Sequence, residues 1–176
     1  GLGDAYFLQG RLESSLDHFE RCVSLSRRHG FGRSEVANLP MIAHCLLFLG
    51  HVERGLAACD EAVAMTTRGA MRRARIIALH ARAYLHARYL GEYDVALAIA
   101  QDALAQAREI EARRFEAQTM GIVARMLGWA GRPDAARQLA RDGLALCRSI
   151  DAMTYAGPTL LAETLDVHLA KQHSAA

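Results

Sequence analysis

The stretch Leu46-Leu47-Phe48-Leu49-Gly50 decides the fold, because the same pattern of an apolar run closed by a glycine returns at a fixed period. Four such glycines, Gly10, Gly50, Gly91 and Gly131, are spaced by 40, 41 and 40 residues. A glycine adopts the left-handed conformation that ends a helix at little cost. Each glycine therefore predicts the end of one helix, and the second apolar stretch that follows it predicts the next.

A second feature repeats at the same period. Arg33, Arg73 and Arg114 are spaced by 40 and 41 residues and lie where the first helix of each following pair should begin. Periods of about 20–50 residues are typical of solenoids and arrays. The sequence therefore predicts an all-α superhelix, a solenoid of about four helical hairpins with a ~40-residue period plus a C-terminal helix. From these signals, the expected helices span about residues 1–9, 13–28, 34–49, 53–67, 71–90, 93–111, 113–130, 133–149 and 154–170.

Composition excludes several classes of protein. The chain has 176 residues, of which 52% are hydrophobic, and this suits one soluble domain. The formal net charge of +2 does not favour nucleic-acid binding. No apolar run reaches the roughly 18–20 residues that span a bilayer, so we expect no membrane partner. The widely spaced cysteines form no C-x-x-C pair and are expected to be reduced thiols in the cytoplasm, with Cys22, Cys59 and Cys147 buried on the second helices of hairpins and Cys45 on a first helix.

The domain boundaries follow from the repeat. We expect one repeat domain over residues 1–170, a fragment of a larger protein, and a flexible tail over 171–176. The first helix is shorter than its counterparts, so its apolar face could be covered by a second copy of the chain in a homo-oligomer. Pro40 falls inside an expected helix, where it predicts either a kink or a later start with Asn38 as the N-cap.

Two sets of residues carry a family resemblance. The first hairpin resembles the tetratricopeptide repeat at its small and aromatic positions: Leu2-Gly3, Tyr6, Gly10, Ser15, Phe19 and Cys22. The segments 1–6, 28–33, 35–38, 112–118 and 157–158 resemble the C-terminal repeat region of bacterial class III adenylate/guanylate cyclases. In that family a cyclase domain and an ATPase domain precede such repeats. The resemblance implies that metal-binding and nucleotide-binding residues lie outside this chain.

In tetratricopeptide-like stacks the first helix of each hairpin lines a concave groove that binds extended peptides or helices. Alignment on the glycines places seven candidate partner-binding residues near this groove: His44, Arg82, Arg88, Tyr89, Gln118, Arg125 and Trp129. Arginines beside aromatic rings are typical of binding hot spots and favour an acidic partner. Two alternatives stay open, because the aromatic side chains could pack between hairpins and the arginines could pair with Glu109, Glu111 or Glu116 on a solvated face.

No motif for chemistry is present. The chain has no phosphate-binding glycine loop, and so we expect no nucleotide cofactor. His18 and Cys22 are one helical turn apart, but no further ligand pair follows, and so we expect no metal site and no catalytic site. The leading hypothesis is a protein-interaction and regulatory module of a multidomain bacterial signalling protein, which binds that protein's other domains or a separate protein. The alternatives are a free-standing adaptor for a peptide or protein and, less favoured, an enzyme with a site in the groove.

Overall fold

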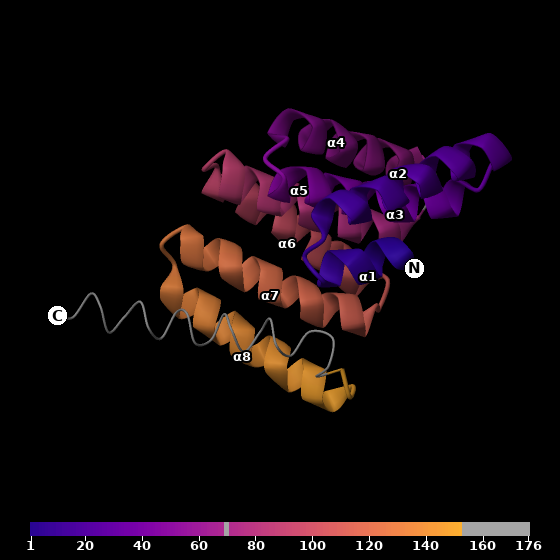
Figure 1. Ribbon diagram of the computed structural model, residues 1–176. Helices are drawn as coiled ribbons and strands as arrows, with labels where there is room; N and C mark the ends of the chain where they lie inside the picture. Colours follow the sequence, from indigo (N-terminus) through magenta and orange to yellow (C-terminus); the bar gives the residue numbers. More distant parts are fainter. Residues whose placement is uncertain (69–70, 153–176) are drawn as a thin grey trace. The chain divides into compact units, whose positions relative to one another are not determined.

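The computed structural model describes residues 1–68 and 71–152, and within them the chain forms eight α-helices and no strand (Figure 1). The helices are α1 (Leu2–Leu8), α2 (Leu12–His29), α3 (Gly32–Phe48), α4 (Val52–Arg68), α5 (Arg72–Tyr89), α6 (Tyr93–Glu109), α7 (Arg113–Trp129) and α8 (Pro133–Ser149). The predicted all-α hairpin fold is confirmed, and its helix boundaries agree within two residues. The expected C-terminal helix and the tail at 171–176 lie outside the described residues.

The chain divides into two compact units, with the boundary inside α5. Unit 1 is Gly1–Leu85 and unit 2 is His86–Ala176. In unit 1, α1 packs on α2, α2 on α3, and α3 on α4, whereas in unit 2, α6 packs on α7 and α7 on α8. Short turns join these neighbours, so each pair is antiparallel, as Figure 1 shows for α7 and α8.

The repeated glycines end the first helix of each hairpin as the sequence predicts. Gly50 has φ = 83°, and the N–H of the next residue, His51, donates to the carbonyl of Leu46 at 2.8 Å. A donor five residues after its acceptor closes the last turn of a helix. After Gly91 the corresponding bond runs from Glu92 to His86 at 2.9 Å, one residue further back. The end of α5 therefore holds one extra residue, which explains the single spacing of 41 between the glycines.

The turns between hairpins use different residues at one position. Gly30 ends α2 with φ = 71°, and Glu111, 81 residues later, ends α6 with φ = 53°. A side chain in this left-handed region costs roughly 1–2 kcal/mol, which glycine avoids. Glu111 therefore holds a strained backbone at a position where the first repeat uses glycine.

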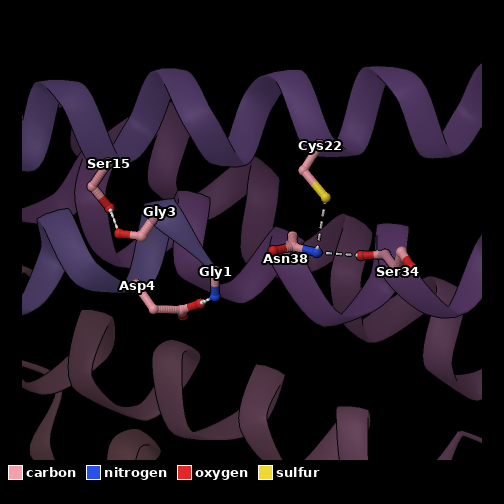
Figure 2. A network of polar contacts seen from close by, with 7 residues as sticks. All are labelled: Gly1, Gly3, Asp4, Ser15, Cys22, Ser34 and Asn38. Atoms are coloured by element: carbon pink, nitrogen blue, oxygen red, sulfur yellow. Dashed lines mark hydrogen bonds and ion pairs between the residues drawn. The ribbon is translucent and has the colours of Figure 1, made fainter.

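Small residues let the two helices of a hairpin approach closely. Ser15, Gly55, Ala96 and Ala136 occupy the same repeat position, and all four are buried. A Cβ atom on Gly55 would lie 2.9 Å from the side chain of Leu47, which leaves no room for a larger residue. The hydroxyl of Ser15 donates to the carbonyl of Gly3 at 2.9 Å and ties α2 to α1 (Figure 2).

Pro40 lies inside α3, which begins at Gly32, so the alternative of a later helix start is wrong. Asn38 is not an N-cap. Its amide donates to the carbonyl of Ser34 at 2.6 Å and lies 3.4 Å from the sulfur of Cys22 (Figure 2).

All four cysteines are free thiols, and Cys45, Cys59 and Cys147 are buried as expected. Burial raises the pKa of the Cys59 thiol to about 12. Cys22 is only half-buried, and its expected full burial is wrong. Its sulfur contacts the polar side chain of Asn38 and is not packed only against apolar side chains.

Candidate interaction surfaces

Three predicted partner-binding residues share one stripe of α7. Gln118, Arg125 and Trp129 are spaced by seven and four residues, which places them on one side of a helix. Arg114, the repeated arginine, continues the stripe toward the start of the helix and is exposed. Gln118 and Arg125 are half-buried, and Trp129 is 38% exposed. We call these four residues the α7 strip.

Arg88 and Tyr89 lie at the end of α5, in the same unit as the α7 strip. Arg88 is exposed and Tyr89 is half-buried. Counted from the repeated arginine of each helix, Arg88 occupies the position of Trp129, because both lie 15 residues further on. Alignment on the glycine alone pairs Tyr89 with Trp129, and the extra residue at the end of α5 accounts for the difference.

His44 belongs to unit 1, where it joins an aromatic cluster. Its ring centroid lies 6.5 Å from that of Phe7 and 6.3 Å from that of Tyr84, and the Phe7 and Phe48 rings are 6.1 Å apart. Burial lowers the pKa of His44 to about 4, so its ring is neutral at pH 7. The cluster links α1, α3 and α5. Sequence reasoning missed Phe7 and Tyr84, although the aromatic residues near each glycine were a usable signal.

Arg82 points toward the second helix of its neighbouring hairpin. Its guanidinium pairs with Asp60 of α4 at 3.5 Å, and its side chain is 35% exposed. Arg82 and Arg88 are six residues apart and therefore differ in direction by about 240° around the helix. These two arginines therefore project from different sides of α5. Arg82 lies in unit 1 and Arg125 in unit 2, and their predicted role in one partner-binding groove stays a prediction.

A second kind of surface lies between the second helices of successive hairpins. In unit 1, a groove of about 490 Å³ lies between α2 and α4 with α3 as its floor, and we call it the unit 1 groove. Its edges include Glu20, Arg27, Arg54 and Glu61. In unit 2, a groove of about 570 Å³ lies between α6 and α8 with α7 as its floor, and we call it the unit 2 groove. Neither groove was predicted from the sequence.

An arginine–glutamate pair joins successive hairpins in both units. Arg27 donates to Glu35 at 2.6 Å, and Arg108 donates to Glu116 at 3.1 Å. Both glutamates lie in the first turn of a helix, where the helix dipole also favours a negative charge. The bond to Glu35 raises the pKa of Arg27, so this guanidinium stays charged. Glu116, one of the three glutamates expected to pair with the candidate arginines, therefore pairs with Arg108. Arg113 also lies within 3.2 Å of Glu116, and neither of these two arginines belongs to the α7 strip.

The candidate metal pair does not assemble into a site. The ring of His18 stacks on that of Tyr6 at 5.2 Å, and Cys22 lies against Asn38. Within residues 1–68 and 71–152, no three His, Cys, Asp or Glu side chains gather closely enough to hold a metal ion. In the same ranges no helix has both the length and the apolar character to cross a membrane.

Two segments of the chain match the model of a known repeat family. The tetratricopeptide repeat model matches residues 1–29 and 117–150. The first match covers the α1–α2 hairpin, and the second covers α7 and α8. Tetratricopeptide repeats are generally protein-binding scaffolds without catalytic activity. A search of curated proteins found no match by sequence.

Solved structures with tetratricopeptide-like repeats share the fold. One crystal structure of a Podosopora anserina putative kinesin light chain with nearly identical repeats has a TM-score of 0.69 at 16% identity, and the alignment covers 98% of this chain and 84% of that chain. A second structure of that kinesin light chain has a TM-score of 0.64 at 15% identity, with coverage of 97% and 93%. At these identities the likeness extends to the fold and not to the ligand.

Proposed function

We propose that this chain is a protein-interaction and regulatory module, and that the α7 strip is its main contact surface. The observation that carries this proposal is the alignment of Gln118, Arg125 and Trp129 on one stripe of a first helix. First helices of tetratricopeptide hairpins are the usual contact surface for partners. Tryptophan and arginine are also the residues enriched among binding hot spots.

The proposed partner is a protein segment with acidic side chains. Arg114 and Arg125 contribute two positive charges to the strip, and Arg88 adds a third within unit 2. A guanidinium can bind a carboxylate through two parallel hydrogen bonds, and a tryptophan ring beside it supplies apolar contact area. The partner would then place a carboxylate near Arg125 and an apolar side chain near Trp129.

The resemblance to class III cyclase repeat regions supports a more specific context. In this reading the module belongs to a cytoplasmic bacterial signalling protein of the cyclase/ATPase type, and it binds the other domains of that protein. The alternative is a free-standing adaptor that recruits a separate protein. The gene decides between them: upstream codons for a nucleotide-binding domain favour the first, and an initiator methionine directly before Gly1 favours the second.

Photo-crosslinking tests whether the strip contacts a partner. Replacing Gln118 by p-benzoylphenylalanine in the native host should yield a discrete cross-linked protein, because this position lies mid-strip. The matched control carries the same probe at Arg21, an exposed position on α2 in unit 1. Equal products from both positions would show non-specific capture and would contradict the proposal.

A further inference from the structure

The unit 1 and unit 2 grooves occupy the same place in two different hairpin pairs. Every residue that lines the unit 2 groove lies 81 positions after a residue that lines the unit 1 groove. Examples are Arg27 with Arg108, and Glu61 with Asp142. The two grooves are therefore built on one backbone design, and differences between them come from the side chains.

In unit 1, two ion pairs cross the groove. Arg54 on α4 reaches Glu20 on α2 at 3.2 Å, and Arg27 on α2 reaches Glu61 on α4. These two pairs run in opposite directions across the same opening. They pair all four charged side chains at the edges with each other.

In unit 2, both residues that correspond to the Arg54–Glu20 pair are uncharged. Gln101 stands where unit 1 has Glu20, and Ala135 stands where it has Arg54. Arg108 is held by Glu116 at 3.1 Å. Asp142, one methylene shorter than Glu61, accepts a hydrogen bond from the amide of Gln138 at 2.9 Å and forms no ion pair within residues 1–68 and 71–152.

The floor of the unit 2 groove is apolar. Leu104 from α6, Val123 and Leu127 from α7, and Leu139 from α8 line it. Leu139 is partly exposed, whereas the other three are buried. Asp142 lies three residues after Leu139 on α8, so the carboxylate and the apolar side chain are neighbours on one face.

We propose that the unit 2 groove binds an amphipathic segment of a partner protein, with an arginine or lysine of that segment on Asp142 and its apolar side chains on Leu127 and Leu139. This inference rests on the proposed function, because it assumes that the chain binds proteins. It adds a second site on a different surface and with the opposite charge preference. The chain itself provides the precedent: in unit 1 Arg27 pairs with Glu61, whereas its counterpart in unit 2, Arg108, pairs with Glu116 and forms no ion pair with Asp142 within the described residues.

The test uses a phage-displayed library of random 16-residue peptides selected on the full 176-residue chain, followed by fluorescence anisotropy with the selected peptides. Three variants are compared with the wild type. Asp142→Asn removes the charge at constant shape. Gln101→Glu with Ala135→Arg transplants the unit 1 bridge into unit 2. Glu20→Gln with Arg54→Ala makes the reverse change in unit 1 and is the matched control, and circular dichroism melting verifies that each variant folds.

The proposal predicts selected peptides that combine apolar residues with arginine or lysine. Asp142→Asn should weaken their binding about tenfold or more, as loss of a charge-assisted hydrogen bond does. The transplanted bridge should weaken it at least as much, and the control should leave it unchanged.

Four results would overturn the proposal. The first three are selected peptides that lack a cation, an unchanged affinity for either unit 2 variant, and a selection that yields no binders. The fourth is a wild-type dimer in light scattering that becomes a monomer when the bridge is transplanted, because the occupant of the groove would then be a second copy of the chain. Selected peptides that lose affinity only on Arg125→Ala and Trp129→Ala would refute this inference and support the proposed function.

Discussion

Acid should destabilise unit 1 through two histidines that are kept neutral, His44 on α3 and His80 on α5. Burial lowers the pKa of His80 to about 3, with a smaller contribution from His44, and burial lowers the pKa of His44 itself to about 4. In the unfolded chain both rings have the ordinary value of 6.5. Between about pH 6.5 and pH 4 the unfolded chain therefore binds protons that the folded chain does not, and stability falls as the pH falls.

The size of the effect follows from the pKa difference. One pH unit below the unfolded pKa costs each ring about 1.4 kcal/mol, so lowering the pH from 7 to 5 costs about 2 kcal/mol for His80. His80 is 4% exposed, whereas His44 is half-buried, and its share of the loss is smaller. The total loss should lie between about 2 and 4 kcal/mol.

Urea denaturation at pH 7 and pH 5 measures this loss. His80→Gln keeps a polar side chain of similar size and should reduce the pH dependence by about 2 kcal/mol. The control is His51→Gln, because His51 is exposed. The reasoning would be refuted if His80→Gln left the pH dependence unchanged, or if an NMR titration placed the pKa of His80 near 6.5.

Two further predictions concern stability and reactivity. Glu111→Gly should raise the free energy of unfolding by about 0.5–1 kcal/mol, because glycine adopts the left-handed conformation without strain and the added entropic cost is smaller. Urea denaturation measures this gain, and Glu109→Gly, a substitution within α6, is the control. Cys22 should react with a thiol reagent in the native state well before Cys59, whose pKa burial raises to about 12, and mass spectrometry of single-cysteine variants that showed equal rates would contradict the burial described.

The sequence was sufficient for the fold because two periodic features agreed. Glycines such as Gly50 and Gly131 predicted the helix ends, and Arg33, Arg73 and Arg114 predicted the helix starts. The extra residue at the end of α5 could not be assigned, because a spacing of 41 does not reveal where the insertion lies. The left-handed conformation of Glu111 could be predicted only from its correspondence to Gly30. The glycines that repeat within the hairpins did not indicate this correspondence.

The candidate site was predictable only in part. The stripe of Gln118, Arg125 and Trp129 follows from helical spacing within α7, and a single helix was enough to align it. The direction of Arg82 required knowledge of its pairing with Asp60 on α4. The groove bridges depend on side chains from helices about 34 residues apart, such as Arg27 and Glu61, and periodicity within one helix carries no information on such pairs.

The most direct test of the proposed function uses the partner that cross-linking identifies. Isothermal titration calorimetry compares its affinity for the wild-type chain with its affinity for the Arg125→Ala, Trp129→Ala double variant. The account predicts a loss of about 2–4 kcal/mol in binding free energy, as expected for truncating an arginine and a tryptophan at a contact surface, with an unchanged melting temperature. Arg21→Ala, an exposed substitution on α2, should leave the affinity as it is. Equal affinity for the wild type and the double variant would contradict the assignment of the α7 strip as the contact surface.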